Sequence, residues 1–533
     1  MVYEPNVSFF NPKLNPKKSM GAKILWADDE IDLLRPHILF LEEKGYEVIT
    51  VNNGIDAVDA VKANDVDIVF LDENMPGLSG LETLDRIIAD FPSLPIIMIT
   101  KSEEEAIMEE AIGSKISDYL IKPVNPKQIL LSVKKNLDEK RLRSEKATTN
   151  YQQEFRQIGM RLNDPLEIED WKELYRKIIR WDLELAEGDQ GMDEVLQMQK
   201  KEANRAFAKF ISSNYIDWVQ ATGDAAPLMS HNVFKRSVIP ELGDDPLFVI
   251  VIDNLRFDQY LTLKPLITQF FRLEEESMYM SILPTATQYA RNAMFAGMMP
   301  ADIQKQHPKL WLNDDEEGGK NQHEQELLAA QLKGLGVNVK HSYHKITNLN
   351  AGKKLVENFS NLGVNDLNVI VYNFVDMLSH ARTDMEVIRE LADDEAAYRS
   401  LTKSWFEHSA LYEIIRQIAD MNGRLMVTTD HGTMHVKNPV KVVGDRNTST
   451  NLRYKQGRNL SYNANEVFEV QNPAEAKLPQ INVSSRYVFC EEDDFFVYPN
   501  NQNYYVNYYR DTFQHGGVSL EEILIPLATF RKR

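Results

Sequence analysis

Short apolar runs in residues 21–140, alternating with helix-like segments, constrain the fold more than any other feature of the chain. The runs are residues 23–27, 66–71, 96–100 and 116–121. Residues 31–44 have the apolar spacing of an amphipathic helix and end at Gly45. Such alternation predicts a parallel sheet covered by helices on both faces, with functional side chains at the carboxyl ends of the strands.

Charged and hydroxyl side chains follow these runs, and the carboxyl edge of the predicted sheet would gather them. They are Asp28, Asp29, Asp72, Thr100 and Lys122. Three carboxylates at one edge would repel one another unless a hard cation such as Mg²⁺ neutralised them. The same cation would polarise an incoming phosphoryl group.

These residues, with the turn Met75-Pro76-Gly77, resemble the receiver domain of two-component response regulators. The resemblance implies a flavodoxin-like fold in which Asp72 is the phosphoacceptor. The Mg²⁺ ligands that it implies are Asp28, Asp29, Asp72 and the carbonyl of Asn74. Thr100 and Lys122 would contact the phosphoryl oxygens, and Tyr119 would be the aromatic switch. The alternative is an unrelated flavodoxin-like domain with ordinary strand-end carboxylates, which the agreement of five positions disfavours.

Residues 141–235 are highly charged and helix-favouring, with apolar residues at alternating steps of three and four. Gly188 and Gly191 separate two runs, with Trp171, Leu174, Ile178, Trp181 and Leu185 in the first and Ala203, Phe207, Phe210 and Trp218 in the second. We expect a helical bundle that connects the receiver to the next domain or to a second protomer, so that phosphorylation favours a homodimer. The absence of a basic recognition helix from the sequence argues against direct sequence-specific DNA binding.

The remaining residues, 236–533, contain buried runs that each lie beside a potential metal ligand. We expect strands at residues 247–252, 369–375, 425–429 and 523–527. The ligand candidates are Asp253, Asp376, His380, Asp430, His431 and His515, with Thr287 before a helix-like segment at 289–295. Strand ends of a parallel sheet lie on one edge, so these side chains can meet there. Carboxylate oxygens and imidazole nitrogens suit a pair of Zn²⁺ ions.

This order of residues resembles the alkaline-phosphatase superfamily over most of residues 245–530. The zinc sites that the resemblance implies are Asp253, Thr287, Asp430 and His431 for one ion, and Asp376, His380 and His515 for the other. It also implies that a metal-bound threonine attacks phosphorus and that the phosphothreonyl enzyme is then hydrolysed. The predicted nucleophile is Thr287, which precedes Pro300 at the spacing of nucleotide pyrophosphatase/phosphodiesterase relatives. Thr285 is the alternative.

The threonine narrows the reaction, because in this superfamily threonine is typical of phosphodiesterases and serine of monoesterases. Sulfatases need a modified cysteine or serine, and the single cysteine, Cys490, lies far from the motif. The cations that could bind substrate phosphoryl oxygens are Arg256, Arg291, Arg453 and Lys455. The alternative is that they are exposed charges on helices and on a solvated loop.

The receiver, the connector and a C-terminal domain with Asp253-Asn254-Leu255-Arg256 and the ending His515-Gly516-Gly517 resemble PorX-like response regulators, a family with a C-terminal PglZ domain. This resemblance implies a sensor histidine kinase as partner and a role in type IX secretion and gliding. Two functions stay open. The first is zinc-dependent hydrolysis of nucleotide or oligonucleotide phosphodiesters under phosphorylation control, which the complete set of ligands favours. The second is a noncatalytic platform for a ligand or for a partner such as a sigma factor.

Composition sets further limits. A single cysteine excludes a disulfide framework and fits a cytoplasmic protein. No window approaches the ~18 uncharged apolar residues of a membrane span. Residues 1–20 are rich in proline and asparagine without an apolar core, so we expect a flexible leader rather than a secretory signal. The net charge of −20 argues against nonspecific nucleic-acid binding.

Overall fold

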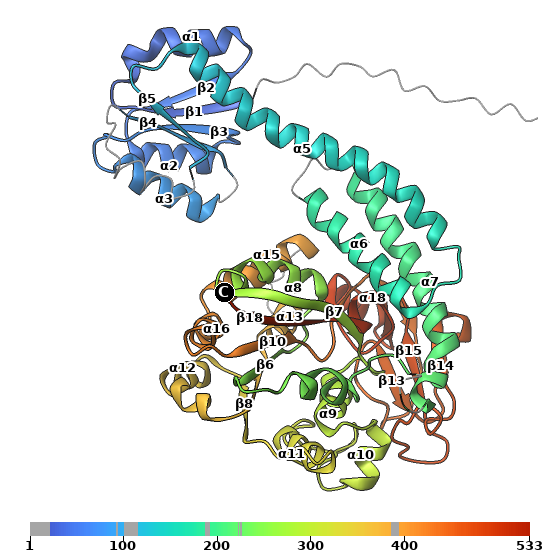
Figure 1. Ribbon diagram of the computed structural model, residues 1–533. Coiled ribbons are helices and arrows are strands. Elements are labelled where there is room, and N and C mark those ends of the chain that lie inside the picture. The colour runs from blue at the N-terminus through green and yellow to red at the C-terminus, as the bar shows by residue number, and fades with distance from the viewer. Residues whose placement is uncertain are drawn as a thin grey trace, which may run out of the picture. The chain divides into compact units, whose positions relative to one another are not determined.

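The computed structural model describes residues 22–91, 94–100, 116–186, 192–221, 223, 226–384 and 394–533. Within helices, it leaves out the side chains of residues 138–149, 193 and 380–384. The chain divides into two compact units, residues 1–149 and 150–533 (Figure 1). The predicted leader, residues 1–20, lies outside the described residues. Among the helices that are described, none has both the length and the apolar character needed to cross a membrane.

The first unit contains a five-stranded parallel sheet with the strand order β2-β1-β3-β4-β5 (Figure 1). Its strands are β1 (Lys23–Ala27), β2 (Glu47–Val51), β3 (Ile68–Asp72), β4 (Ile96–Thr100) and β5 (Asp118–Ile121). Its helices are η1 (Ile31–Leu34), α1 (Arg35–Glu43), α2 (Gly54–Ala63), α3 (Gly80–Asp90) and the start of α5 (Pro126–Arg161). Apolar side chains fill both faces of this sheet, with Trp26 and Phe70 on one and Leu25 and Leu71 on the other.

Strand β2 was not among the predicted strands. It lies at the edge of the sheet, where Glu47 and Thr50 are exposed and the other three residues are half-buried. An edge strand needs no continuous apolar run, so the pattern that revealed the three inner strands β1, β3 and β4 was missing here. The strand that carries Asp72 ends at the aspartate itself rather than one residue before it.

The helical connector consists of the end of α5, α6 (Ile168–Ala186) and α7 (Asp193–Gln220). Helix α5 is continuous through residue 140, where the sequence predicted a domain boundary. Trp171 of α6 packs on Phe207 of α7 with 5.2 Å between ring centroids, and both side chains are buried. Tyr175 on α6 packs against Phe257 at 6.1 Å. Most residues of the apolar stripes therefore pack inside the second unit, whereas Phe210 and Trp218 are half-buried, and the homodimer stays a prediction.

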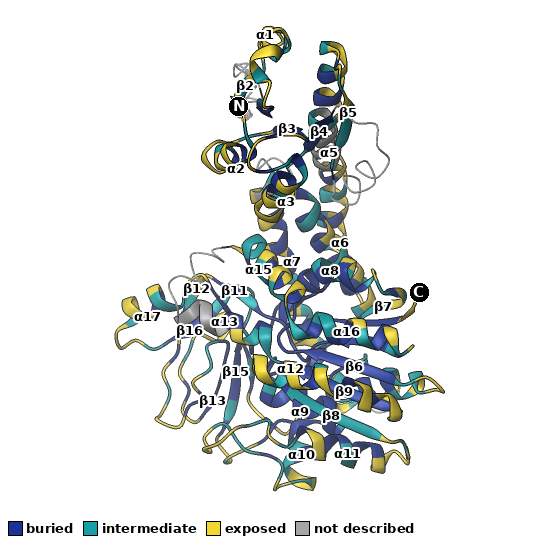
Figure 2. Cartoon of the chain, turned by 90° about the vertical axis from the view of Figure 1, so that its left-hand side faces the viewer, coloured by how far each residue is buried: buried dark blue, intermediate teal, exposed yellow. Residues whose placement is uncertain are grey.

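The second unit is built on a six-stranded sheet with the order β7-β18-β10-β6-β9-β8. Its strands are β6 (Leu247–Ile252), β7 (Phe271–Met280), β8 (His341–Ile346), β9 (Leu367–Tyr372), β10 (Arg424–Thr428) and β18 (Leu524–Lys532). The four strands β8, β9, β6 and β10 are parallel, whereas β18 is antiparallel to both β10 and β7. Figure 2 shows β6 and β9 as buried along their length, which identifies this sheet as the core of the unit.

Helices and small strands surround this sheet. The helices are α8 (Phe257–Ile267), α9 (Thr287–Ala296), α10 (Pro300–Gln306), α11 (Glu324–Gly334), α12 (Leu349–Glu357), α13 (Phe374–Asp384), α15 (Glu395–Glu407), α16 (Ala410–Asp420), α17 (Gln502–Tyr509) and α18 (Leu520–Ile523). Short helical turns are η4 (Phe234–Val238), η5 (Ile239–Glu241), η6 (Phe359–Val364) and η7 (Ala464–Glu466). The small strands are β11 (Met434–Val436), β12 (Asn438–Lys441), β13 (Tyr454–Gly457), β14 (Val467–Val470), β15 (Arg486–Cys490), β16 (Asp494–Val497) and β17 (Thr512–Gln514).

Two predicted strand ends need correction. Strand β9 ends at Tyr372, so Asp376 belongs to the first turn of α13 rather than to the end of a strand. Strand β18, which follows His515, is antiparallel to its neighbour β10. An antiparallel strand begins at the edge of the sheet where its parallel neighbours end. His515 precedes β18 in the chain, and it therefore lies at the edge where β6 and β10 end.

Candidate receiver site and metal centre

The carboxyl edge of the first sheet brings together the predicted phosphoryl-transfer residues. Carboxylate oxygens of Asp28, Asp29 and Asp72 lie within 4.8 Å of one another. Lys122 Nζ lies 2.6 Å from Asp72 Oδ1 and 2.8 Å from Asp28 Oδ2. The main-chain amide of Asn74 donates to Asp72 Oδ2 at 3.2 Å. One lysine among three carboxylates leaves negative charge that a divalent cation can neutralise, so the residues fit a bound Mg²⁺.

Burial and charge act on Asp72 in opposite directions. Asp72 is 3% exposed, and its burial raises the pKa of the carboxyl group, although Lys122 acts to lower it. Thr100 is buried at the end of β4, opposite Ile121 in the β4–β5 register, which puts it beside Lys122. Burial raises the pKa of Tyr119, while a hydrogen bond with Thr100 acts to lower it. Thr100, Tyr119 and Lys122 thus occupy neighbouring positions at the edge that carries Asp72.

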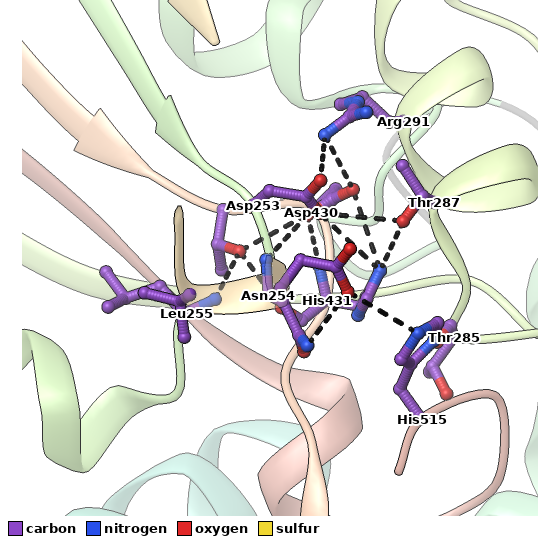
Figure 3. Close-up of polar contacts among 12 residues, drawn as sticks. Asp253, Asn254, Leu255, Thr285, Thr287, Arg291, Asp430, His431 and His515 are labelled. Atoms are coloured by element: carbon purple, nitrogen blue, oxygen red, sulfur yellow. Dashed lines mark hydrogen bonds and ion pairs between the residues drawn. The ribbon is translucent and has the colours of Figure 1, made fainter. Parts of the chain in front are cut away.

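Four side chains of the predicted first zinc site converge in the second unit (Figure 3). Asp253 follows β6, Asp430 and His431 follow β10, and Thr287 begins α9. Ligand atoms of Asp253, Asp430 and His431 lie within 4.8 Å of one another, and all three residues are buried. The hydroxyl of Thr287 lies 3.0 Å from His431 Nε2 and 3.5 Å from Asp253 Oδ1. Among the described residues, Asp430 Oδ2 accepts no hydrogen bond, so a cation would satisfy it.

The predicted second site lies next to the first. His515 Nε2 is 3.8 Å from Asp376 Oδ1, and the His515 ring stacks on His431 with 4.4 Å between centroids. The main chain of His380 belongs to α13, but its side chain lies outside the described residues. Three carboxylates and two imidazoles therefore lie close together. They belong to Asp253, Asp376, Asp430, His431 and His515. This donor set fits a pair of zinc ions.

Comparison with known proteins identifies the parts of the chain. Residues 233–530, more than half of the chain, match the family model of the BREX system PglZ alkaline phosphatase-like domain. The chain belongs to the PglZ family. Residues 141–219 match the PorX response regulator linker domain, and residues 24–134 match the response regulator receiver domain. A receiver, this linker and a PglZ domain form the PorX-like architecture that the sequence predicted, and the predicted fold class is confirmed with it.

Curated relatives match the receiver. The chain is 35% identical over 113 residues to the transcriptional regulatory protein ResD of Bacillus subtilis, covering 21% of this chain and 47% of the relative. It is 30% identical over 115 residues to SrrA of Staphylococcus aureus, covering 22% of this chain and 47% of that protein. The chain thus spans about half the length of the curated relatives that it matches.

Solved structures match the same region. A CheY-like receiver domain from Methanospirillum hungatei is 26% identical with a TM-score of 0.22, covering 22% of this chain and 95% of that chain. A two-component response regulator from Clostridium difficile is 30% identical with a TM-score of 0.21, covering 22% of this chain and 96% of that chain.

The two candidate nucleophiles differ in their surroundings. Thr285 is fully buried, and its hydroxyl donates to the carbonyl of Gly517 at 2.9 Å and accepts from the amide of Gly516 at 3.0 Å. Thr287 is half-buried and presents its hydroxyl to Asp253 and His431. Of the two threonines, Thr287 is thus the one whose hydroxyl contacts the predicted zinc ligands, whereas the hydroxyl of Thr285 bonds main-chain groups of the PglZ domain.

Arg291 contacts two of the predicted zinc ligands, Asp253 and Asp430. Its Nη1 lies 2.7 Å from Asp253 Oδ2 and 3.7 Å from Asp430 Oδ2, and its Nε lies 2.5 Å from Glu324 Oε1. Burial raises the pKa of Asp253 well above its usual range, although Arg291 opposes this shift. Burial would also raise the pKa of Asp430, but His431 and Arg291 together lower it. Arg291 thus compensates the negative charge of Asp253 and Asp430. The sequence had predicted that it binds substrate and had not predicted this contact.

The prediction that Arg256 binds substrate is also corrected, because its side chain is buried and paired with protein groups. It is 1% exposed and pairs with Asp258, and its Nη2 lies 3.6 Å from Glu395 Oε2. Arg399 donates to the same Asp258 at 3.1 Å. Lys200 of the linker helix α7 lies 2.6 Å from Glu395 Oε2. Arg256 therefore belongs to an interior network of ion pairs between the linker and the PglZ domain.

Arg453 and Lys455 were predicted to belong to an anion-binding cluster on an insertion, but both lie inside the PglZ domain. Arg453 is fully buried and donates to Glu522 through Nη2 at 2.6 Å and Nε at 3.2 Å. Lys455 is 1% exposed, and its Nζ donates to the carbonyl of Ser449 at 3.0 Å. Burial, only weakly opposed by Cys490, lowers the pKa of Lys455 to about 8. Their partners are protein groups, so we withdraw their assignment to substrate.

Replacing Lys455 by methionine should stabilise the protein near neutral pH. The pKa of this lysine falls from 10.5 to about 8 on folding, so below pH 8 the folded chain holds a buried charge at a cost. Between these two values the folded lysine loses its proton first, so the free energy of unfolding of the wild type rises with pH. We expect Lys455→Met to gain about 2 kcal/mol at pH 7, after allowing for the lost hydrogen bond, and the gain to shrink towards pH 10.

Denaturant unfolding of the full chain at both pH values measures this difference. Lys441→Met is a matched control, because Lys441 is exposed on β12 and carries no burial cost. It should change the free energy of unfolding little at either pH. A loss of stability in Lys455→Met at pH 7 would show that the contacts of the lysine outweigh the cost of burying its charge.

The sequence pattern missed one residue that contacts both halves of the metal centre. Asn254 is buried with a φ of 67°, and its amide nitrogen Nδ2 donates to Asp376 Oδ1 at 3.3 Å. Its main-chain amide donates to Asp430 Oδ1 at 3.3 Å. Asparagine tolerates this left-handed conformation better than most residues, so an asparagine two residues after a buried strand was the available signal.

Proposed function

We propose that this response regulator is phosphorylated on Asp72 and that phosphorylation controls a zinc-dependent phosphodiesterase in the PglZ domain. The receiver implies a cognate sensor kinase as partner, and we take it to be a histidine kinase. The proposed substrates are nucleotide or oligonucleotide phosphodiesters. The PorX-like architecture supports a role in type IX secretion and gliding, in the cytoplasm, with a homodimer formed on phosphorylation.

The observation that carries this proposal is the position of the Thr287 hydroxyl, 3.0 Å from His431 Nε2 and 3.5 Å from Asp253 Oδ1. Asp253, Asp430 and His431 would hold one zinc, and Asp376, His380 and His515 the other. Bound zinc would supply Lewis acidity and lower the pKa of a hydroxyl or water beside it. Thr287 would then attack phosphorus and lose its proton while one alcohol of the diester leaves with a proton, and the rest of the substrate would stay joined to Thr287 through a phosphodiester bond. Water would hydrolyse this bond, which releases a phosphomonoester and restores the threonine hydroxyl. Thr287 begins α9, and the positive end of a helix favours phosphoryl oxygens there.

Charge supports a diester rather than a monoester. The two zinc ions that the centre would hold exceed the charge of the three carboxylates of Asp253, Asp376 and Asp430 by about one positive charge. A phosphodiester adds one negative charge, whereas a monoester adds nearly two at neutral pH. Arg291 is engaged by Asp253 and Glu324, so it is not placed to neutralise the second charge of a monoester.

The test is a metal and activity assay on the purified full chain. We expect two zinc ions per chain by elemental analysis, and hydrolysis of bis(p-nitrophenyl) phosphate that a chelator abolishes and added zinc restores. Hydrolysis of p-nitrophenyl phosphate should be slower under the same conditions. Each assay is run with and without a small phosphodonor. A chain that holds zinc but cleaves no diester in either state would favour the noncatalytic platform, with a sigma factor as the first partner to test.

A further inference from the structure

Glu522 is a buried carboxylate near the metal centre that has no part in the proposed reaction. It lies in the short helix α18 and is 0% exposed. Its charge is compensated by Arg453, which donates to both carboxylate oxygens at 2.6 and 3.2 Å. It also accepts hydrogen bonds from the Ser519 hydroxyl at 2.7 Å and the Gly517 amide at 2.9 Å. Removing both charges of an ion pair from water costs free energy that their attraction often does not repay, so stability alone is a weak explanation for this pair.

The bond to Gly517 fixes the segment that carries His515. Thr285 holds the same segment, because its hydroxyl bonds to the Gly516 amide at 3.0 Å and to the Gly517 carbonyl at 2.9 Å. Glu522 Oε1 lies 3.5 Å from that hydroxyl. A Cβ on Gly517 would come within 2.6 Å of the Cys490 carbonyl oxygen and 2.8 Å of the Arg453 guanidinium. The segment is therefore packed tightly against the ion pair as well as hydrogen-bonded to it.

This arrangement sets the orientation of the His515 ring. His515 Nδ1 lies 3.2 Å from the main-chain carbonyl oxygen of Thr285, which can only accept a hydrogen bond. The proton of the neutral ring is therefore on Nδ1, and Nε2 keeps its lone pair. Nε2 is the nitrogen that faces Asp376, at 3.8 Å. A histidine that donates its other ring nitrogen to a carbonyl has the tautomer and angle that a metal needs.

We propose that Glu522 is a positioning residue for His515. With Arg453 as its counter-ion and Thr285 as the link, it fixes the tautomer and ring angle with which His515 binds the second metal. The inference rests on the proposed function, because it assigns His515 to a zinc ion. It adds to that function a carboxylate, Glu522, that contacts neither metal nor substrate.

Metal binding tests this role separately from catalysis. Glu522→Gln removes the charge that pairs with Arg453, and Thr285→Val removes one hydroxyl without changing charge or size. Each should weaken one of the two zinc sites by about 10- to 100-fold, as the loss of a residue that orients a metal ligand typically does. The other site should keep its affinity. Zinc affinity is measured by competition with a chromogenic chelator, on the full-length chain.

Cobalt provides a spectroscopic readout that a purely structural role would not change. The visible absorption of Co²⁺ depends on the geometry and identity of its ligands, so the variants should lose or shift the bands of one ion. Glu241→Gln is the control for a broken ion pair. Glu241 bonds Arg424 at the start of β10, the end of that strand opposite to Asp430 and His431. This control should lower the unfolding temperature while both metals bind as in the wild type.

The outcomes separate this inference from the proposed function. If both Glu522→Gln and Thr285→Val bind two zinc ions with wild-type affinity and an unchanged cobalt spectrum, Glu522 does not position His515. If Glu522→Gln fails to fold, Ser519→Ala takes its place, because it removes the hydroxyl that donates to Glu522 and leaves the Arg453 ion pair and Thr285 intact; weaker zinc binding supports the proposal, and wild-type binding overturns it. If the wild type binds two zinc ions but cleaves no diester, the proposed activity is wrong while the comparison of metal affinities still decides the role of Glu522. A wild type without zinc overturns both.

Discussion

Replacing Thr287 with valine should abolish phosphodiester hydrolysis while zinc largely remains bound. Valine has nearly the same shape, but it lacks the hydroxyl that lies between Asp253 and His431. The proposed mechanism requires a covalent phosphoryl ester on this hydroxyl, so the rate should fall by at least about 10²-fold without it. Six protein ligands are left to hold the metals: Asp253, Asp376, His380, Asp430, His431 and His515. The measurement pairs the initial rate on a chromogenic diester with zinc content per chain.

Two other variants show whether this result is specific. Asp430→Asn should lose both activity and one zinc ion, because a misplaced ion no longer stabilises the attacking or leaving oxygen. With zinc in excess, Thr285→Val should lose less activity than Thr287→Val. Full activity in Thr287→Val beside a dead Thr285→Val would mean that the spacing to Pro300 selected the wrong threonine. Full activity in both would rule out covalent catalysis by either residue.

The sequence could predict where the candidate ligands lie because all strands of a parallel sheet end at the same edge. Asp253 and Asp430 each follow a buried strand, and β6 and β10 turned out to be neighbours in one sheet. Two aligned strands bring their following residues to one edge whatever the loops do. The fold class was readable for the same reason, since long apolar runs in alternation with helices admit few arrangements.

Burial was not readable at the single-residue level. Arg256, Arg453 and Lys455 looked like available cations because a sequence shows charge without showing what surrounds it. Each proved to be at most 1% exposed. The partner of Arg453 is Glu522, and that of Arg291 is Glu324, which begins a separate helix. No local pattern links such pairs, because the fold alone brings distant segments into contact. Edge strand β2 was missed for a related reason, since only inner strands require unbroken apolar sequence.

Hydrogen bonds between α7 and α18 give the linker a physical connection to the candidate metal centre. Asn204 of the linker helix α7 accepts from the Leu520 amide at 2.8 Å and donates to Glu521 Oε2 at 3.0 Å. Glu522, the next residue, holds the segment of His515 through Gly517. A small movement of α7 would therefore reach the centre through α18. In the proposed function, the signal starts with phosphorylation of Asp72 in the receiver.

Asp72→Ala should therefore remove both phosphorylation and every response that depends on it. With a small phosphodonor and Mg²⁺, the wild type should gain one acid-stable, base-labile phosphoryl group per chain, and Asp72→Ala should gain none. The reason is geometric: the Asp72 carboxylate contacts Lys122 Nζ at 2.6 Å and accepts from the Asn74 amide at 3.2 Å. Asp59→Ala is the matched control, because Asp59 is an exposed aspartate on α2 of the same unit and should leave labelling unchanged.

The same pair of variants tests what phosphorylation controls. Light scattering of the wild type should show a shift towards the mass of a dimer when the donor is added, and the diesterase rate should change with it. In Asp72→Ala both quantities should be the same with and without donor, while zinc content stays at the wild-type value because the receiver supplies none of its ligands. Labelling that persists in Asp72→Ala would move the phosphoacceptor to another residue. If the wild type is labelled normally but neither its mass nor its rate changes, phosphorylation of the receiver does not control the PglZ domain. The signal would then not reach the contact of α7 with Leu520 and Glu521.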